Sequence, residues 1–354
     1  MSEQVTARLH AADGGDAAAR RAANKTVVVT GAAGFIGSNL SAELLRRGYT
    51  VRGVDNLSQG SELNIAESLT DPAFTLSRID VRDEATLDRA CEGAAAIVHL
   101  AAYKIPRYSD ALDTLTINTV GTMNAAEAAR RNGARLVAAS TSDVYGKNAE
   151  LPFREDSDLI IGPPHVRRWA YAISKMYGEQ LLLAVHERHG IDVVLLRFFG
   201  GYGPNQHRSW WGGPQAVFID QALDDQPCEI HGDGQQARSF TYVSDHVDAI
   251  IRAIETPAAA NQVFNIGSTR EITIEALARL IWRLVRGEQE PKLKFIAYET
   301  FGRYEDVRRR LPDISQAQLL LGFQPRVDLE AGLATTIRWQ VERRRELGIA
   351  TPVG

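Results

Sequence analysis

The hydrophobic pattern of the chain begins with a short apolar run at residues 26–29, followed by a glycine-rich turn and a helical pattern. The run carries no charge and consists of β-favouring residues, which is typical of a buried parallel strand. Residues 38–48 carry apolar side chains at helical spacing, with basic residues near the end and Gly48 as the stop, which predicts a helix.

The alternation of apolar strands and helices continues to residue 198. Buried strands are predicted at 51–54, 74–79, 95–99, 135–139 and 192–197, and helices at 84–92, at 112–132 and around Tyr171. Strands that alternate with helices at this pitch predict a doubly wound parallel sheet, an α/β fold of the Rossmann class. Ligands of such folds bind at the carboxyl ends of the strands.

The turn between the first strand and the first helix contains Gly31, Gly34 and Gly37. A strand, a glycine turn and a helix N-terminus form an anion site, because free backbone N–H groups and the positive end of the helix dipole point to one place. Gly31 allows the tight turn, Gly34 lets a pyrophosphate approach, and Gly37 lets the helix pack on the strand. The turn therefore predicts dinucleotide binding.

Asp55 ends the second strand, 18 residues after Gly37. A carboxylate there can accept both hydrogen bonds from an adenosine ribose and would repel a 2′-phosphate, which favours NAD over NADP. Arg52 and Ser58 keep NADP open as an alternative.

The pattern changes after residue 198, where a loop rich in glycine, proline and tryptophan precedes a helix at 215–223 and short strands. We therefore expect three parts. Residues 1–24 form a mobile tail, residues 25–198 an NAD-binding Rossmann domain, and residues 199–354 a smaller, mainly substrate-binding region with some segments returning to the Rossmann domain.

Composition limits the function classes. The net charge of −4 gives no electrostatic case for a nucleic-acid partner. Cys91 and Cys228 lie far apart and outside any CxxC or Cys/His cluster, so we expect reduced core thiols and no metal site. The sequence has no apolar run of about 18 residues, which argues against a membrane span. The alanine-rich start lacks the apolar core of a secretory signal, so we expect a cytoplasmic protein.

Polar residues follow the predicted strand 135–139, in the order Thr141, Ser142 and Asp143. A helix further on carries Tyr171 and Lys175, which at a spacing of i and i+4 share one face. A nearby ammonium lowers the pKa of a phenol, so Tyr171 can accept a proton near neutral pH. A solvated turn and an amphipathic surface pair are the structural alternatives, but the preceding dinucleotide turn favours a catalytic set.

Several sequence motifs together resemble the extended short-chain dehydrogenase/reductase family, in its nucleotide-sugar-modifying branch. They are TGAAGFIG, HLAA, STSDVYG, YAISK, RFFGGYGP, GDGQQARSFTYVSD and RRLPD, and the resemblance spans residues 25 to about 344. It implies that Tyr171 is the catalytic base, that Lys175 holds the nicotinamide ribose and that Thr141 bonds to the reacting sugar hydroxyl. It also implies a homodimer and a nucleotide-sugar substrate.

The resemblance implies a cofactor site and a substrate site. Asp80 and Val81 would flank the adenine, Lys104 would approach the cofactor phosphates and Phe198 would lie near the nicotinamide. The whole expected cofactor site comprises Gly31, Gly34, Phe35, Ile36, Gly37, Asp55, Asn56, Ser58, Asp80, Val81, Leu100, Ala101, Ala102, Lys104, Asn118, Tyr171, Lys175 and Phe198. The expected substrate site comprises Arg107, Phe199, Gln215, Phe218, His231, Arg238, Arg310 and Asp313. Arg238 and Arg310 would grip the diphosphate, which suits the guanidinium fork, and Asp313 would contact its ribose.

Within this branch, residues 141–143, 168–171 and 304–313 look like those of UDP-glucuronate decarboxylases. Asp143 stands where that group has Glu, and Gly200 stands where it usually has Asn, which removes a side-chain contact to the substrate phosphates. The resemblance implies that Tyr171 takes the proton of the sugar 4-hydroxyl while NAD⁺ takes the hydride from C4. The new ketone, β to the C6 carboxylate, then receives the electrons released as CO₂ leaves, so no metal is required. Asp143 or a water that it orients would protonate C5, and the ketone would be reduced or released.

Three alternatives stay open. A UDP-glucuronate or UDP-sugar 4-epimerase uses the same Tyr, Lys and Thr. A sugar 4,6-dehydratase needs an acid where this chain has Ser142, which is a poor proton donor. A non-catalytic NAD-sensing protein would need the glycine turn but not Tyr171 and Lys175. The nucleobase also stays open, since uracil and thymine differ by one methyl group.

Overall fold

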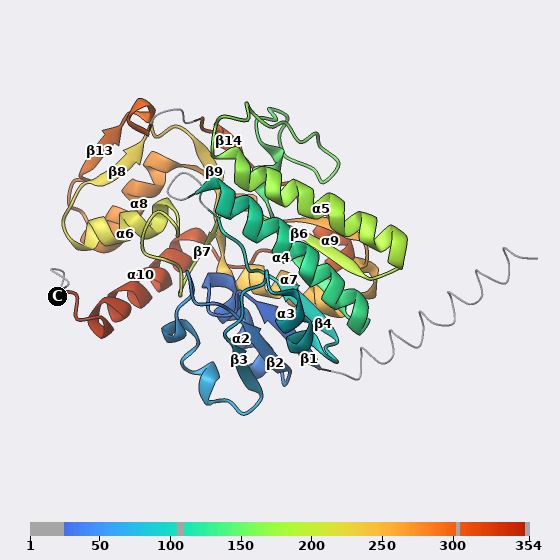
Figure 1. Cartoon of the computed structure of the whole chain (residues 1–354). Helices are drawn as coiled ribbons and strands as arrows, with labels where there is room; N and C mark the ends of the chain where they lie inside the picture. The colour runs from blue at the N-terminus through green and yellow to red at the C-terminus, as the bar shows by residue number, and fades with distance from the viewer. Residues whose placement is uncertain (1–24, 105–109, 302–304, 351–354) are drawn as a thin grey trace, which may run out of the picture.

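A seven-stranded parallel sheet forms the centre of the molecule (Figure 1), in a computed structural model that describes residues 25–104, 110–301 and 305–350. The strand order is β11-β6-β5-β4-β1-β2-β3, and all neighbouring strands run parallel. These strands are β1 (Thr26–Thr30), β2 (Thr50–Val54), β3 (Phe74–Ser77), β4 (Ala96–His99), β5 (Arg135–Thr141), β6 (Val193–Phe198) and β11 (Gln262–Ile266). The predicted parallel α/β sheet is confirmed.

Helices cover both faces of this sheet. One face packs against α2 (Phe35–Arg46), α7 (Val243–Glu255) and α9 (Ser315–Leu321), and the other against α3 (Glu84–Cys91), α4 (Ala111–Asn132) and α5 (Trp169–His189). Side chains of β1 alternate between these two cores, with Val27 and Val29 in one and Val28 in the other. Because both faces are covered, the strand is apolar throughout, as its sequence indicates.

Helix α2 begins at Phe35, earlier than the predicted start at residue 38. Gly34 is the N-cap residue, and it has no side chain that could bond to the N–H groups of the first turn. The glycine turn therefore passes directly into the helix.

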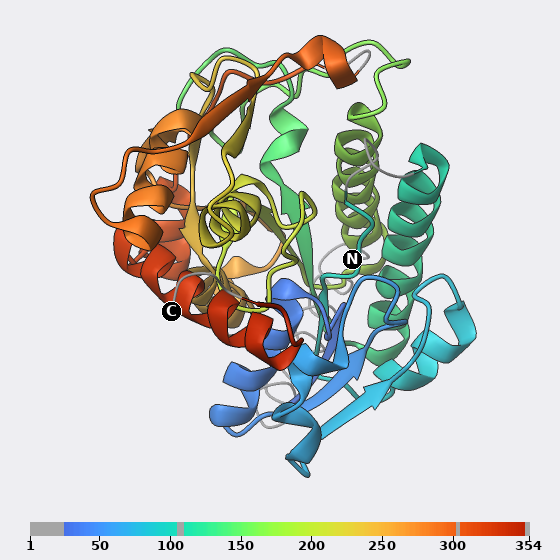
Figure 2. The same ribbon diagram turned by 90° about the vertical axis from the view of Figure 1, so that its left-hand side faces the viewer.

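A smaller group of elements follows β6. Helices α6 (Pro214–Leu223), α8 (Ile274–Arg286) and α10 (Leu329–Glu346) share a core with β8 (Cys228–His231). Figures 1 and 2 show α6, α8 and β8 on the opposite side of the molecule from α4 and α5. The short strands pair as β7 (Gly201–Tyr202) with β10 (Thr241–Tyr242), β9 (Ala237–Ser239) with β12 (Glu271–Thr273) and β14 (Arg309–Arg310), and β8 with β13 (Leu293–Ile296).

The direction of winding reverses at β1. The chain runs from β1 to β2 and β3 on one side, and returns to β4, β5 and β6 on the other. A crevice at such a reversal is where open α/β sheets bind ligands. Strand β11 joins the sheet beside β6, so a segment from beyond residue 199 returns to it. The exact division into domains stays a prediction, and the expected tail at 1–24 lies outside the described residues.

Candidate active site

A cavity of about 1130 Å³ lies at the carboxyl ends of the sheet strands. Its walls come from the glycine turn, from the ends of β2, β4, β5 and β6, and from segments around α6, β9 and β14. This volume exceeds the usual range for a single small ligand, so the cavity has room for a dinucleotide and a second molecule.

The glycine turn forms one end of the cavity. Gly31 has a φ of +71°, and a Cβ added there would lie 2.9 Å from the backbone nitrogen of Ala101. A Cβ on Gly37 would lie 2.0 Å from the carbonyl oxygen of Gly31, so any side chain there would separate α2 from the turn. Gly34, Phe35 and Ile36 line the cavity at the uncapped N-terminus of α2, where N–H groups are left for an anion.

Asp55 closes the glycine turn onto β2. Its side chain is 8% exposed, and its two oxygens accept the N–H groups of Ala33 at 2.9 Å and Leu57 at 2.8 Å. Burial raises the pKa of this carboxyl. Each carboxylate oxygen has a further lone pair, so Asp55 can hold the turn and still accept a ribose hydroxyl. Arg52, the residue that kept NADP open, donates instead to the Glu92 carbonyl at 2.6 Å.

The expected adenine end lies at the tips of β2 and β3. Asn56 donates to Asp80 at 3.1 Å, and Arg82 holds the pKa of Asp80 at about 2, so this carboxylate is charged at neutral pH. Further expected cofactor residues line the same cavity, namely Ser58, Val81, Leu100, Ala101, Ala102, Lys104 and Phe198.

The expected catalytic residues meet where β5 ends beside the first turns of α5. Thr141 ends β5, and its hydroxyl lies close enough to Tyr171 to oppose the rise in its pKa. Lys175 lies one turn further along α5 and donates to the Ala139 carbonyl at 2.8 Å. Burial lowers the pKa of Lys175 to about 8, whereas burial and the charge of Asp143 raise the pKa of Tyr171. The predicted lowering of the Tyr171 pKa by Lys175 is therefore wrong for this site, because burial and Asp143 act in the opposite direction. The three side chains line one wall of the cavity, and a hydroxyl held there would meet both a phenol and a cation.

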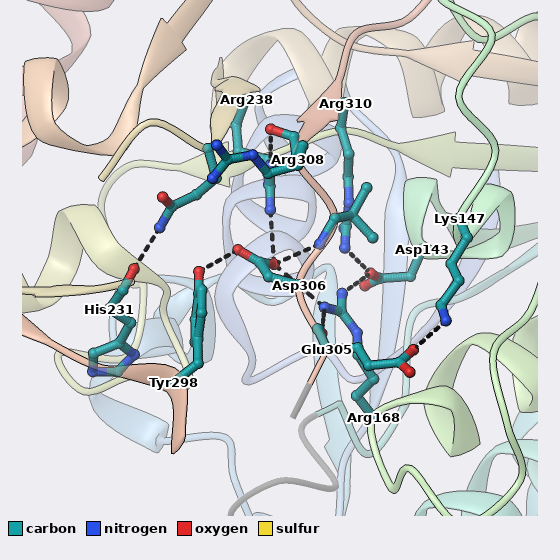
Figure 3. A network of polar contacts seen from close by, with 12 residues as sticks. Asp143, Lys147, Arg168, His231, Arg238, Tyr298, Glu305, Asp306, Arg308 and Arg310 are labelled. Atoms are coloured by element: carbon teal, nitrogen blue, oxygen red, sulfur yellow. Dashed lines mark hydrogen bonds and ion pairs between the residues drawn. The ribbon is translucent and has the colours of Figure 1, made fainter. Parts of the chain in front are cut away.

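Asp143 lies between two arginines at the same wall (Figure 3). Its Oδ1 is 2.5 Å from Arg310 Nη2 and 3.3 Å from Arg168 Nη2. The two guanidinium groups hold the pKa of Asp143 below its usual range despite burial. Asp143 is therefore an anion at neutral pH and serves as the shared partner of two cations. Ser142 lines the cavity beside it and is 5% exposed.

A second carboxylate, Asp306, extends this cluster. Its Oδ1 lies 3.0 Å from Arg238 Nη2 and 3.3 Å from Arg168 Nη1, and its Oδ2 accepts the Tyr298 hydroxyl at 2.5 Å (Figure 3). Arg238 is the main cause of a pKa of about 2 for Asp306. Three arginines, including Arg310, thus face two carboxylates, and this wall keeps an excess of positive charge for an anionic ligand.

The remaining expected substrate residues divide into two groups. His231 lines the cavity and stacks on Trp210 with ring centroids 4.1 Å apart, and Gln215 and Phe199 line it too. Phe218 is fully buried in the core of the smaller group of elements, and does not line the cavity.

Two further expected contacts are not at the cavity. Asp313 accepts the N–H of Ser315 at 2.8 Å at the start of α9, instead of lining the cavity. Asn118 lies behind the wall, where it donates to the Ser174 hydroxyl at 2.9 Å. Arg107 lies outside the described residues.

Comparison with known proteins identifies the family. Residues 27–267 match the family described as "NAD dependent epimerase/dehydratase family". The chain belongs to this family. It is therefore an NAD-dependent enzyme of the epimerase/dehydratase type, as the sequence motifs predict.

Its relatives include decarboxylases and epimerases of nucleotide sugars. A UDP-N-acetyl-alpha-D-glucosaminuronate decarboxylase of Bacillus cytotoxicus is 34% identical, over 89% of this chain and 97% of that protein. UDP-glucuronic acid decarboxylase 1 of Xenopus tropicalis is also 34% identical, over 89% of this chain and 72% of its own. Among solved structures, a UDP-glucuronic acid 4-epimerase of Bacillus cereus with UDP-glucuronic acid and NAD matches with a TM-score of 0.80 and 29% identity, covering 90% of this chain and 99% of that one.

Two further properties concern only the residues in the ranges given above. Within them, no three His, Cys, Asp or Glu side chains gather as a metal site, and none of the helices is long and apolar enough to cross a membrane.

Sequence reasoning assigned no role to Arg168, Tyr298 and Asp306. Arg168 immediately precedes the helix that carries Tyr171, and Asp306 lies close to Arg310 in the chain. The available signal was a charged residue close in the chain to an expected site residue. Their convergence could not be read from the sequence, because 138 positions separate Arg168 from Asp306.

The backbone explains why residue 200 is a glycine in this chain. Its φ is +32°, and a Cβ there would lie 2.1 Å from the carbonyl oxygen of Ser239. The Gly200 carbonyl accepts the N–H of Thr241 at 2.7 Å, so the turn is held closely against the start of β10. In this backbone glycine fits, and an Asn side chain would require the turn to move.

We expect Gly200→Asn to destabilise the protein by about 2 to 4 kcal/mol, through backbone strain and the collision with Ser239. Urea unfolding measures this. Gly133→Asn is the matched control, since Gly133 also has a positive φ, of +63°, but nothing within 4 Å of its Cβ position. Equal unfolding free energies for the two variants would contradict the interpretation.

Proposed function

We propose that this enzyme is a UDP-glucuronate decarboxylase. The observation that carries the proposal is the position of Asp143, which lies two residues after Thr141 and is paired with Arg168 and Arg310. An arginine pair beside the catalytic Tyr171 is suited to a sugar that carries a carboxylate in addition to its diphosphate. The decarboxylases among its relatives, 34% identical over nearly nine-tenths of this chain, support the same reaction.

The first step is oxidation at C4 of the sugar. Tyr171 accepts the proton of the 4-hydroxyl, and Thr141 hydrogen-bonds to the same oxygen. Burial and Asp143 raise the pKa of Tyr171, and the Lys175 cation, one helical turn away on α5, is the group that would oppose them when the proton moves. Bound NAD supplies the hydride acceptor, and later the hydride donor, for C4. The glycine turn, Asp55 and Asp80 are the groups that would hold its pyrophosphate, ribose and adenine.

The second step is loss of the carboxylate. The C4 ketone lies β to C6, so the electron pair of the breaking C5–C6 bond passes into the ketone as CO₂ leaves. Thr141 and the reprotonated Tyr171 then donate hydrogen bonds to the developing negative charge on the C4 oxygen. Because its pKa is lowered, Asp143 is ionised, so a water that it orients is the better proton donor to C5. The ketone is then reduced to give a UDP-pentose or released.

A 4-epimerase is the second candidate. The observation that favours it is the match to a UDP-glucuronic acid 4-epimerase, with a TM-score of 0.80. Such an enzyme would use the same Tyr171, Lys175 and Thr141. Dehydration is disfavoured, because Ser142 occupies the position where that reaction needs an acid. The mass of the product from UDP-glucuronate separates decarboxylation from epimerisation.

We also propose a cytoplasmic homodimer. Leu112 and Met123 on α4 are separated by about three helical turns and so share a face, and Ile173 and Tyr177 are one turn apart on the neighbouring α5. All four apolar side chains are exposed by 40% or more. Exposed apolar side chains on two helices that pack together are suited to contact with the same helices of a second copy. The buried, unpaired cysteines accord with a reducing compartment.

The double variant Met123→Glu with Tyr177→Glu is expected to be monomeric, since it places charges in the proposed interface. Light scattering at micromolar concentration measures the mass. The control is Leu319→Glu, which changes a side chain that is 82% exposed on α9 and should leave the dimer intact. A dimeric double variant, or a monomeric parent protein, would refute this interface.

A further inference from the structure

A buried ion pair lies behind the catalytic wall. Glu179 on α5 and Arg197 on β6 are each 5% exposed. Arg197 grips the carboxylate with both ends of its fork, through Nε at 2.9 Å and Nη2 at 2.8 Å. Burying two charges costs much of what their attraction returns, and apolar residues often replace such pairs without loss of stability. Stability alone therefore does not explain this pair.

Glu179 connects the pair to the catalytic residues. It lies four residues after Lys175 and eight after Tyr171, on the same face of α5. The Ser140 hydroxyl donates to Glu179, and Lys175 donates to the carbonyl of Ala139 at 2.8 Å. Helix α5 is thus attached to β5 at two consecutive residues, directly before Thr141.

Arg197 extends the connection toward the substrate side. Its Nη1 donates to the Tyr145 hydroxyl at 2.9 Å, which in turn donates to Asn265 at 2.7 Å. The Asn265 amide donates to the Phe153 carbonyl at 2.9 Å and to that of Asp313 at 3.2 Å. Asp313 lies three residues after Arg310. One continuous set of buried hydrogen bonds therefore joins the catalytic helix to the segment that carries the arginine.

We propose that Glu179, held by Arg197, is a positioning residue that fixes Tyr171 and Lys175 against Thr141 and keeps Lys175 positively charged. The inference rests on the proposed function in one respect, namely that Tyr171 and Lys175 carry out the chemistry. Glu179 acts through these residues and touches no substrate.

The charged groups around Lys175 determine whether loss of the Glu179 charge would raise or lower the pKa of the lysine. Glu179 faces it from α5 and raises its pKa, against burial. His99 faces it from β4, and burial keeps this imidazole neutral by lowering its pKa to about 3. Tyr171 lies on the same helix, and Asp143 acts on Tyr171 from the segment after β5. β5 contributes no titratable side chain beside Ala139, and Arg197 lies beyond Glu179 on β6. Glu179 is therefore the source of negative charge behind the cation.

Two substitutions separate charge from position. Glu179→Gln keeps the shape but removes the negative charge, so Lys175 and Tyr171 lose their protons at lower pH. The pH profile of kcat/KM should then move down by roughly half to one pH unit. Glu179→Asp keeps the charge but shortens the side chain by one methylene, so the profile should stay in place while kcat falls about tenfold at unchanged KM. Asp192→Asn is the control, because it removes the partner of Arg135 at the far end of β5 and should move neither quantity.

A second measurement needs no substrate. The full chain with NAD bound is treated with acetic anhydride at a series of pH values, and peptide mass spectrometry follows the acetylation of Lys175. The pH dependence of this reaction reports the protonation of the lysine directly. It should shift to lower pH in Glu179→Gln and stay in place in Glu179→Asp. This result would support the proposal even if UDP-glucuronate proved not to be the substrate. Failure of the positioning role and failure of the proposed function can therefore be told apart.

Glu179→Gln leaves Arg197 without its counter-charge and so risks misfolding. The double variant Glu179→Gln with Arg197→Met removes both charges and should show a smaller shift in the same direction. Ser140→Ala keeps both charges and should lower kcat several-fold at unchanged KM. An unmoved pH profile in folded Glu179→Gln or in the double variant would overturn the proposal, as would wild-type kcat in both Glu179→Asp and Ser140→Ala.

Discussion

Tyr171→Phe should lower turnover of UDP-glucuronate by at least about a thousandfold, because it removes the group that accepts the 4-hydroxyl proton. Tyr171 lies beside Thr141 and one helical turn from the Lys175 cation. The ring keeps its packing, so NAD binding and the unfolding free energy should not change. The initial rates of CO₂ release and of NADH formation measure the loss.

The control for this variant is Tyr177→Phe, which removes a hydroxyl from the same helix at a side chain that is 46% exposed. It should retain the parent rate. A Tyr171→Phe enzyme within tenfold of the parent rate would remove Tyr171 from the mechanism, and would revive the reading of the chain as a non-catalytic NAD-binding protein.

Asp143→Asn should lower CO₂ release about a hundredfold while leaving oxidation at C4 less affected. The substitution removes the carboxylate that Arg168 and Arg310 share, whereas Tyr171 and Lys175 keep their contacts. Single-turnover experiments should therefore show NADH forming before CO₂ appears. Comparison of the two time courses separates the oxidation step from the decarboxylation step.

Asp143→Glu is the matched variant, because it keeps the charge and extends the side chain by one methylene. It should restore most of the CO₂ release that Asp143→Asn loses. If Asp143→Asn released CO₂ at the parent rate, the arginine-bound carboxylate would have no part in decarboxylation.

The fold could be predicted where a segment of the sequence is apolar throughout. The uncharged run of β1 requires burial on both faces, and its glycine turn leaves few alternatives for the residues that follow. Strand β11 was not predicted, because its sequence, Gln-Val-Phe-Asn-Ile, includes two amides. Its pairing with β6 supplies the context that the local sequence lacks.

The site could be predicted where its residues follow one another in the chain. Thr141 and Asp143 lie at one strand end, and Tyr171 and Lys175 on one helix face, so local geometry brings each pair together. The positions of residues assigned one at a time were predicted less well. Phe218 on α6 lies in the core that α6 forms with α8 and β8, away from the cavity.

The arginine cluster shows why the rest could not be predicted. Arg168 precedes α5, Arg238 lies in β9 and Arg310 in β14, and the pairing of β14 with β9 is what brings the last two together. Asp306 lies three residues before Arg309, where β14 begins, and it meets Arg238 because β14 pairs with β9. Such contacts depend on the complete fold rather than on any local pattern.

The central claim is best tested with UDP-glucuronate that carries ¹³C at C6, incubated with the purified chain and NAD⁺. The account predicts release of ¹³CO₂ and a sugar-nucleotide product that is lighter by the lost carboxyl group, either a UDP-pentose or its 4-keto form. A product of unchanged mass that retains the label and differs in stereochemistry would contradict decarboxylation and identify a 4-epimerase.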